Sequence, residues 1–499
     1  MPEMRQGPSE TRLSGEDLSF WWFDSPMQPT TMALLMVLDR APDASRLQWA
    51  FERAVAAVPR LVQRVADAPL DLTLPHWEFD PTFDLDYHVR RHVLSGRADV
   101  DELFREIVPA YETPFDRARP LWEARIYDGL DANGHSALFF KLHHAVADGV
   151  GGNAIFAAMT DPERDPAEQP RGGIPYLSKG PWPQRPLGAR LLDALRDRVA
   201  LDLQRARAVA GAAVDTVQHP EQLGRALQAV RSLIELARFD SHSPLKSSAG
   251  RSRRLSGLDL PFADARALKT ALGGSMIDVI LTIMARAIGR WHVAHRVLNV
   301  RELMTLVPVN LRKPEQWADK PNVGNVATGI LVPLPIRLAD PLVTHREIRK
   351  RMTAKKADPL SAATPLVAEL LSAVPRPLLT WMAESTFGSV DFIVTNVPGI
   401  LVPRYLAGAE ILAAYPFAPV AMKSPVSVAL YGYRDRLFIG LDSDESLMPD
   451  VEAFEAMIVE AFEELRDAVA AKQSGRREKR AAPRPRGERN SNRRREGTT

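Results

Sequence analysis

The spacing of apolar residues along the chain predicts a protein that mixes helices and strands. Apolar residues recurring every three or four positions predict helices over residues 45–58, 100–111, 262–272, 275–291, 341–357, 364–384 and 451–471. Short apolar runs predict buried strands over residues 32–38, 120–127, 136–143, 253–259, 301–309, 327–335, 388–395, 426–433 and 436–442. The sequence DANG at residues 131–134 separates two of these runs and predicts a hairpin.

A long helical pattern separates two such mixed regions. Residues 161–186 are rich in proline and glycine and predict a linker. Residues 187–239 then show one apolar stripe opposed by arginines, and Pro220 divides this pattern into two helices. We expect this region to pack across two domains or to lie on a lipid surface, and the two interpretations are compatible.

Length and composition set the number of domains and exclude some chemistry. A chain of 499 residues with 45% hydrophobic content is long enough for two or three domains with their own cores. The absence of cysteine excludes disulfides, cysteine metal ligands and cysteine nucleophiles. Residues 1–12 are polar, and no uninterrupted apolar run reaches about 18 residues, so neither a signal peptide nor a membrane span is predicted.

The basic residues are concentrated in the C-terminal tail. Residues 473–499 contain ten Lys/Arg and three Asp/Glu, so the tail has a charge of +7 while the whole chain has +2. The rest of the chain is therefore slightly acidic, and a nucleic-acid partner is not expected. The tail is interpreted either as a disordered, solubilising extension or as an electrostatic anchor for anionic lipid.

Two adjacent histidines, His143 and His144, follow an apolar run and precede Asp148 and Gly149. The run predicts a strand and residues 153–159 predict a helix, so the histidines fall on a strand-to-helix turn where side chains can point into a cleft. A neutral imidazole can take a proton from a hydroxyl or thiol near pH 7. Two other interpretations stay open from the residues alone: a histidine satisfied inside the core, and a His-His-Asp metal site without an evident fourth ligand.

Five further segments accompany this motif along the chain. They are LSGEDLSF at 13–20, DPTFDLDYHV at 80–89, PLWE at 120–123, LVPV at 306–309 and TNVPG at 395–399. With HHAVADG at 143–149, they make the chain resemble the bacterial wax ester synthase/acyl-CoA:diacylglycerol acyltransferase family. That family belongs to the wider group of CoA-dependent acyltransferases with an HHxxxDG motif, and the resemblance extends over residues 13–465.

The resemblance implies an α/β fold of two chloramphenicol-acetyltransferase-like domains joined by a helical linker, with the active site in the cleft between them. We therefore expect a disordered N-terminus, an N-terminal acyltransferase domain with the HHxxxDG motif, a helical linker, a C-terminal acyltransferase-like domain and a disordered basic tail. Their expected bounds are residues 1–12, 13–185, 186–250, 251–472 and 473–499.

The reaction implied by the resemblance is transfer of a fatty acyl group from acyl-CoA to diacylglycerol, giving triacylglycerol, or to a long-chain alcohol, giving wax ester. His144 matches the family's general base, and we expect a backbone carbonyl or polar group to hold its second ring nitrogen. Acyl-CoA is a substrate in this scheme, and neither a cofactor nor a metal is expected. The expected location is the cytoplasm, with peripheral contact to the inner membrane face or to lipid bodies.

The other residues of the first-half motifs receive mainly structural roles from the resemblance. Asp148 is expected to anchor the turn through an arginine, and His143 to support that turn. Gly149 is expected to supply the backbone freedom that the turn requires. Pro120 and Trp122 are expected to pack near the acyl channel.

Two segments of the second half complete the predicted site. Thr395 and Asn396 precede a Pro-Gly pair, which is consistent with oxyanion donors facing the cleft or with a turn that caps a strand. Asp278 matches the second residue of an Asn-Asp pair in the family, but Ile277 stands where asparagine is usual. Ser275 is then a candidate cap for the helix that follows.

Two other functions compete with this hypothesis. One is condensation-type transfer from a carrier protein to an amine or hydroxyl, although the chain shows no carrier domain. The other is a lipid-binding protein with a vestigial site, for which the Ile277 departure is the main argument. The intact HHxxxDG motif favours the enzyme.

Overall fold

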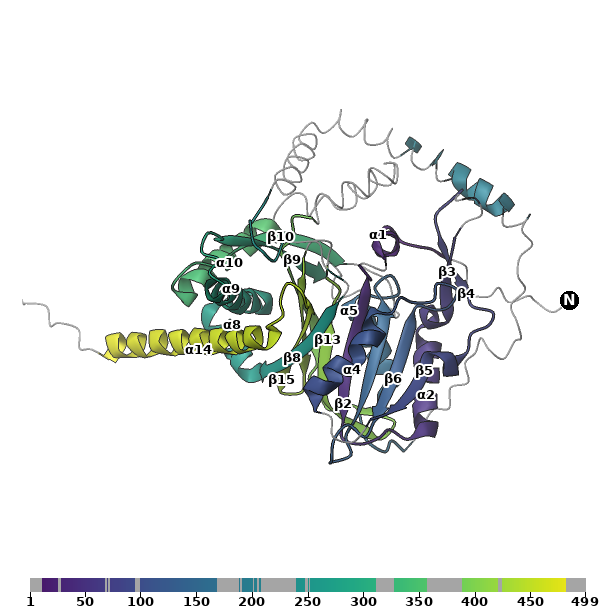
Figure 1. The fold of residues 1–499 in the computed structure, drawn as a ribbon, viewed down its shortest axis with the longest axis horizontal. Helices are drawn as coiled ribbons and strands as arrows, with labels where there is room; N and C mark the ends of the chain where they lie inside the picture. The colour runs from purple at the N-terminus through teal and green to yellow at the C-terminus, as the bar shows by residue number, and fades with distance from the viewer. Residues whose placement is uncertain are drawn as a thin grey trace, which may run out of the picture.

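The computed structural model places the chain in two α/β halves that lie side by side (Figure 1). The residues that the structure describes are 11–25, 28–67, 70, 72–94, 99–167, 188, 191–200, 202–203, 206–207, 239–246, 250, 252–310, 327–356, 388–420 and 424–481. Four predicted segments lie wholly or mostly outside them: the start of the chain, the linker, the helix at 364–384 and the end of the basic tail.

The N-terminal half is built on a six-stranded sheet in the order β12-β13-β2-β7-β6-β5. Its strands are β2 (Thr31–Leu38), β5 (Val89–Val93), β6 (Trp122–Asp128), β7 (Ser136–His143), β12 (Tyr405–Leu406) and β13 (Ala409–Phe417). β2 and β7 run antiparallel, with Leu35 opposite Phe139. All eight residues of β7 are buried, which explains why its sequence is a nearly continuous apolar run.

Helices with aspartate caps cover this sheet. α2 (Ala44–Ala57) begins where the Asp43 carboxylate accepts the Arg46 N–H at 2.9 Å, and α4 (Val100–Glu112) begins after Asp99 in the same way. The apolar stripes of both helices are buried in the core of this half. The same core includes residues of α1 (Gly15–Phe23), η1 (Pro59–Val62) and α5 (Gly149–Met159).

A small sheet and a short helix complete the N-terminal half. β4 (His76–Phe79) lies between β1 (Thr11–Arg12) and β3 (Gln63–Ala66), and α3 (Leu85–His88) leads into β5. Thr11 and Arg12 had been expected in a disordered N-terminus, and this expectation is wrong for both. Their backbones pair with Trp77 and His76 of β4, a contact between segments distant in sequence.

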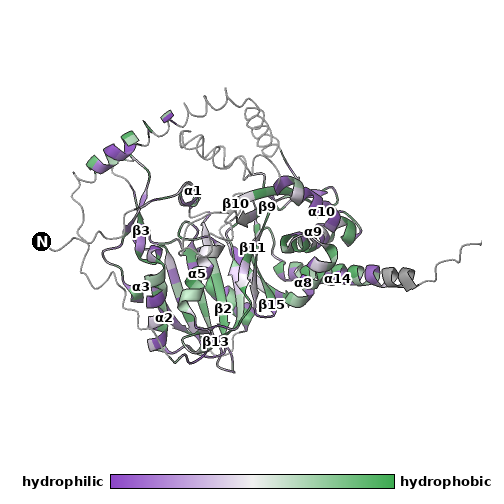
Figure 2. Ribbon diagram, turned by 180° about the vertical axis from the view of Figure 1, so that it is seen from behind, coloured by the Kyte–Doolittle hydropathy of each residue, from purple (hydrophilic) through white to green (hydrophobic). Residues whose placement is uncertain are grey.

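The C-terminal half repeats the layout of a sheet covered by helices. Its sheet has the order β10-β9-β11-β14-β15-β8. The strands are β8 (Arg253–Pro261), β9 (Glu302–Asn310), β10 (Ala327–Pro335), β11 (Phe392–Ile400), β14 (Val426–Tyr433) and β15 (Arg436–Asp444). α9 (Met276–Ala294) is buried along most of its length among α8 (Phe262–Leu272), α10 (Pro341–Lys356) and α14 (Val451–Ala481). Figure 2 shows hydrophobic residues concentrated on the central strands.

One segment of the C-terminal half completes the sheet of the N-terminal half. β13 pairs antiparallel with β2, with Tyr415 opposite Leu35, and β12 pairs with β13. The expected C-terminal domain of residues 251–472 is therefore not a separate structural unit. The addition of β13 to this sheet depends on pairing between residues almost 400 positions apart in the chain. Local periodicity in the sequence does not reveal such pairing.

The C-terminal helix is longer than its sequence pattern predicts. α14 continues to Ala481, so the expected disordered tail from residue 473 begins too early. In Figure 1 this helix extends well beyond the body of the protein. Among the described helices, no single one is long and apolar enough to cross a membrane. The bent pair of α8 and α9 passes that test together, at an angle of 102°, but α9 is a buried core helix.

Candidate active site

Strand alternation places the second histidine in a cavity and the first behind it. Successive side chains of a strand point to opposite faces, so Phe140, Leu142 and His144 share one face and Lys141 and His143 the other. The first three line the cavity, and the other two are almost fully buried on the opposite side. The backbone N–H of His144 donates to the carbonyl oxygen of Thr30 at 2.8 Å. This bond fixes the turn directly after β7.

The His143 ring is held by hydrogen bonds on both nitrogens. Its Nδ1 accepts the backbone N–H of Ala145 at 3.0 Å, so Nε2 bears the proton of the neutral ring. Nε2 lies 3.0 Å from Oγ1 of Thr30, whose own hydroxyl donates to the carbonyl oxygen of Phe20. The His143 side chain does not line the cavity. The structure thus gives His143 contacts that support the turn.

Asp24 extends the network behind the histidines. Its carboxylate accepts the Thr30 N–H at 3.0 Å and lies 3.7 Å from Nε2 of His143, while Arg117 donates to it at 2.9 Å. Burial alone would raise the pKa of Asp24. The hydrogen bonds and the attraction of His143, together with Thr30 and Arg117, outweigh burial and lower that pKa to about 2. Asp24 is therefore ionised around neutral pH.

Asp148 caps the helix that follows the histidines. Its Oδ1 accepts the backbone N–H of Gly151 at 2.8 Å at the N-terminus of α5. Asp148 also lines the cavity, although it is only 4% exposed. The expectation was that an arginine anchors the turn through Asp148, and the hydrogen bond seen here is to a backbone amide.

Gly149 is required by close packing. The backbone φ of Gly149 does not lie in the positive, left-handed region. The expectation that the turn requires the backbone freedom of glycine at this position is therefore wrong. A Cβ at this position would lie 2.7 Å from Cγ2 of Val397 in β11. The start of α5 thus packs directly on the C-terminal half, and the glycine permits that approach.

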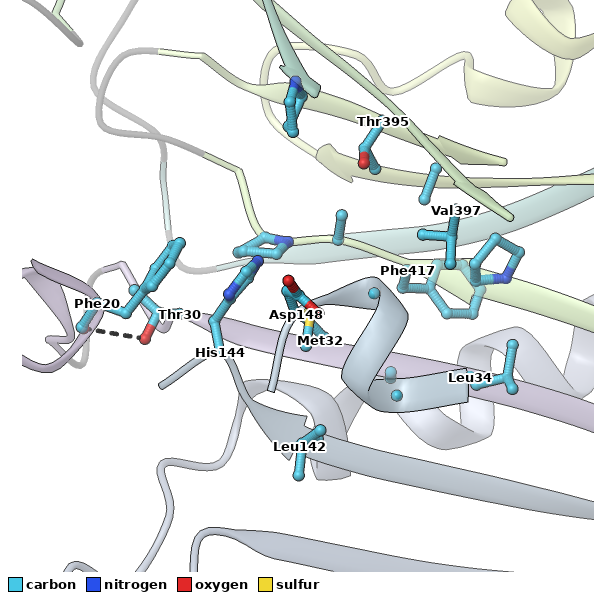
Figure 3. Close-up of a pocket in the computed structure, with 18 of the residues that line it drawn as sticks. Phe20, Thr30, Met32, Leu34, Leu142, His144, Asp148, Thr395, Val397 and Phe417 are labelled. Carbon is cyan, nitrogen blue, oxygen red and sulfur yellow. Dashed lines mark hydrogen bonds between the residues drawn. The ribbon is translucent and has the colours of Figure 1, made fainter. Parts of the chain in front are cut away.

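The cavity lies between the two halves and has a volume of about 410 Å³. The N-terminal half contributes Met32, Leu34 and Leu142 to its walls, together with Phe417 at the end of β13, and the C-terminal half contributes Val397 and Tyr431. Figure 3 shows His144 at one end, with Leu34, Val397 and Phe417 toward the other. A volume in the usual range of ligand pockets and mostly apolar walls fit a lipid chain.

Thr395 and Asn396 reach the cavity from β11. The TNVPG segment is not a turn: β11 continues through it to Ile400, with a register shift after Val397 where it pairs with β14. Figure 3 shows Thr395 on the side of the cavity opposite the histidine turn. The position of Thr395 and Asn396 is consistent with the hypothesis that they donate hydrogen bonds to an oxyanion. The alternative interpretation, a turn that caps a strand, is wrong.

Asn153, which the sequence motifs did not identify, connects α5 to β11 and β14 of the C-terminal half by hydrogen bonds. Its Oδ1 accepts the hydroxyl of Tyr431 at 3.0 Å, and its Nδ2 donates to the carbonyl oxygen of Pro398. All three residues line the cavity. Asn153 lies one helical turn after Gly149, so helical spacing from the motif was the only signal in the sequence.

Phe20 is a second residue whose role the sequence did not reveal, although it is the last residue of the LSGEDLSF segment at 13–20. Its ring is stacked on the imidazole of His144, with centroids 3.8 Å apart and planes 15° apart. Figure 3 shows Phe20 and Thr30 beside the histidine. One face of the His144 imidazole is therefore covered by Phe20 of α1.

Besides His143, three predicted site residues lie away from the cavity lining. Pro120 and Trp122 are buried, and the Trp122 indole donates to the carbonyl oxygen of Leu61 at 2.7 Å. Asp278 accepts both the backbone N–H and the hydroxyl of Ser275 at 2.7 Å, which completes the expected cap of α9. Ile277 packs against the core of the C-terminal half. The structure thus gives the PLW segment and the Ile-Asp pair packing and capping contacts.

No group of three His, Cys, Asp or Glu side chains that could hold a metal ion occurs among the residues described by the structure. The arrangement at the cavity consists of an imidazole, the carboxylates of Asp148 and Glu16, and uncharged polar groups in largely apolar surroundings. An imidazole in such a site can take a proton from a hydroxyl.

The chain matches two models of one protein family. The family model described as the wax ester synthase/diacylglycerol acyltransferase catalytic domain matches residues 13–280, and the model of the C-terminal domain of that family matches residues 323–466. The chain belongs to the wax ester synthase/diacylglycerol acyltransferase family. It is therefore an acyltransferase, as the motifs predicted.

Relatives extend this family match over most of the chain. A Mycobacterium tuberculosis protein provisionally named a diacylglycerol O-acyltransferase is 34% identical over 406 residues, which cover 79% of each chain. Another protein of that organism, with the same type of name, is 27% identical over 473 residues, or 91% of this chain and 90% of the relative.

Solved structures agree on the fold. The wax ester synthase/diacylglycerol acyltransferase from Marinobacter aquaeolei VT8 superimposes with a TM-score of 0.62 at 20% identity, covering 92% of this chain and all of the other. The first condensation domain of the calcium-dependent antibiotic synthetase gives a TM-score of 0.60 at 16% identity, covering 93% and 97%. The predicted α/β fold of the acyltransferase type is thus confirmed.

Proposed function

We propose that this acyltransferase moves a fatty acyl group from acyl-CoA to the hydroxyl of diacylglycerol or of a long-chain alcohol, with His144 as general base. The position of His144 is the observation that supports this proposal most strongly. Its half-buried imidazole reaches a largely apolar cavity between the two halves of the chain. An imidazole that can accept a proton, next to a cavity that can hold a hydrocarbon chain, suits an acceptor that is a lipid alcohol.

The proposed reaction needs no covalent enzyme intermediate, because a thioester is already activated. The acceptor hydroxyl gives its proton to His144 while its oxygen attacks the carbonyl carbon of the acyl-CoA. A tetrahedral intermediate with a negatively charged oxygen forms. Its collapse breaks the carbon–sulfur bond, the imidazolium returns the proton to the sulfur of CoA, and the ester leaves.

Thr395 and Asn396 are the candidates for stabilising the oxyanion. Both line the cavity from β11, opposite the turn that presents His144. Hydroxyl and amide groups can donate hydrogen bonds to a developing negative charge. In this scheme the N-terminal half supplies the base and the C-terminal half supplies the donors, so the reaction requires both.

We further propose that the protein works in the cytoplasm, in peripheral contact with the inner membrane face or with lipid bodies. A helix covers residues 191–200, and Leu192, Leu195 and Val199 on it are 57%, 45% and 59% exposed. Spacings of three and four place them on one face. Replacing Leu195 and Val199 by glutamate should weaken flotation with liposomes. A similar loss on Leu298→Glu, at a site 68% exposed elsewhere, would contradict the assignment.

The direct test is thiol release from palmitoyl-CoA by the purified protein, with diacylglycerol and hexadecanol supplied in parallel. Acceptor-dependent release should fall by on the order of 10²–10⁴ in His144→Ala. Unchanged activity in a folded His144→Ala protein would refute the role of the base. If wild type releases no thiol with either acceptor, a carrier-bound donor is tested next, and failure there favours a lipid-binding protein.

A further inference from the structure

We infer that Phe20 stabilises the protonated form of His144, and so acts as a positioning residue for the base; this inference rests on the proposed function of His144. The stacked rings, with centroids 3.8 Å apart and planes 15° apart, put the face of the phenyl ring against the imidazole. That face has a negative electrostatic potential. When His144 takes the proton of the acceptor, the resulting imidazolium therefore lies on a surface that attracts cations.

The position of Phe20 is determined by the helix that bears it. The Ser14 hydroxyl accepts the Asp17 N–H at 3.0 Å, and the Asp17 carboxylate accepts the Ser14 N–H, so α1 begins with a capping box. Leu18 and Trp21 then bury one side of α1 in the core. The residues that line the cavity are spaced by three and four along the other side: Glu16, Ser19, Phe20 and Phe23.

Thr30 connects the backbones that bear the two stacked rings. Its Oγ1 donates to the carbonyl oxygen of Phe20 at 3.3 Å, and its carbonyl oxygen accepts the N–H of His144 at 2.8 Å. The same hydroxyl oxygen lies 3.0 Å from Nε2 of His143. Thr30 thus fixes the backbone of both stacked residues. This reduces the reorganisation needed when positive charge develops on the imidazole of His144.

The contribution of Phe20 can be separated from that of nearby charges. Among the described residues that line the cavity, the acidic and basic side chains other than the imidazole of His144 are Glu16 on α1 and Asp148 before α5. Behind the turn, Asp24, Arg117 and His143 form the network already described. None of these charged groups is altered chemically when Phe20 is replaced by another apolar residue, so the comparison tests the aromatic face against a constant set of charged side chains.

The test is an NMR titration of the full-length protein labelled with ¹³C-histidine, with His144→Ala used to assign the signal. Phe20→Leu should lower the pKa of His144 by roughly 0.5–1 unit, the size expected from the loss of a cation–π contact. Phe20→Trp should hold or raise it. Phe156→Leu is the matched control, because Phe156 lines the same cavity and stacks edge-on with Tyr431. If Phe20→Leu does not fold, Phe20→Met makes the same comparison.

Activity provides the second measurement. In the pH profile of kcat/KM, Phe20→Leu should move the acidic limb to lower pH by the same amount and lower kcat by roughly 3- to 10-fold. Phe156→Leu should alter KM and leave that limb in place. A Phe20→Leu protein with the wild-type His144 pKa and pH profile would overturn the inference. If His144→Ala remains active while Phe20→Leu still lowers the pKa, the base assignment fails and the stacking effect stands.

Discussion

Gly149 and Val397 meet where the histidine turn of one half of the chain packs on β11 of the other. A Cβ at Gly149 would lie 2.7 Å from Cγ2 and 3.0 Å from Cγ1 of Val397. Val397 directly follows Thr395 and Asn396, the two polar residues that β11 presents to the cavity. The distance between the base and the proposed oxyanion donors therefore depends on this contact.

Gly149→Ala should damage the enzyme through this contact. The added methyl group must displace Val397 or α5, at a cost of about 1–3 kcal/mol in unfolding free energy, and should lower kcat/KM by at least 10-fold. Gly152→Ala is the control in the same helix, since a Cβ there meets no atom within 4 Å. It should raise stability slightly, as expected for alanine in a helix. Urea unfolding and initial rates measure both, and equal effects of the two substitutions would contradict the prediction.

The bonds of Asn153 to Tyr431 and Pro398 should couple the two halves energetically. Burial raises the pKa of Tyr431, so its hydroxyl stays protonated and donates to Asn153. Tyr431→Phe and Asn153→Ala should each destabilise the protein by about 1–2 kcal/mol. The double substitution should cost less than the sum of the two by about 0.5–1.5 kcal/mol. Fully additive unfolding energies would show that the bond contributes nothing.

Asp24 should make stability depend on acid pH. Its pKa is lowered from 3.8 to about 2 in the folded protein. A lowered pKa gives stability that is complete above about pH 4 and is lost as the pH falls through about pH 2. Asp24→Asn should therefore lose about 1–2 kcal/mol at pH 7, and its deficit relative to wild type should shrink toward pH 2. Urea unfolding from about pH 2 to 7 tests this, with the exposed Asp86→Asn as control; a deficit independent of pH would disprove it.

Trp122→Phe should affect stability and leave substrate preference unchanged. The change removes the indole N–H that donates to the buried carbonyl oxygen of Leu61 and disturbs the stack with His88, whose centroid lies 4.5 Å from that of Trp122. A loss of about 1–3 kcal/mol is expected. KM values for acyl-CoA donors of different chain length should stay within about twofold of wild type. A shift in chain-length preference without a loss of stability would place Trp122 in the acyl channel after all.

The separate roles of the two histidines were only partly visible in the sequence. The apolar run and the HHxxxDG pattern predicted the strand-to-helix turn and the importance of His144. Strand alternation could have shown that His143 faces away from His144, because adjacent side chains of a strand point in opposite directions. The partners of His143 could not be predicted, since Thr30 and Asp24 lie more than 110 positions earlier in the chain.

The sequence by itself determined the class of this protein: local periodicity predicted most helices and strands, and ordered motifs predicted an acyltransferase with His144 at its centre. Tertiary structure decided which motifs meet. It joined β13 to the sheet of the N-terminal half, placed Asn396 at the cavity, and kept Trp122 in the core. It also stacked Phe20 on His144. The physical reason is that periodicity and caps act over one or two turns, whereas pairing and packing between distant segments depend on the complementarity of whole surfaces.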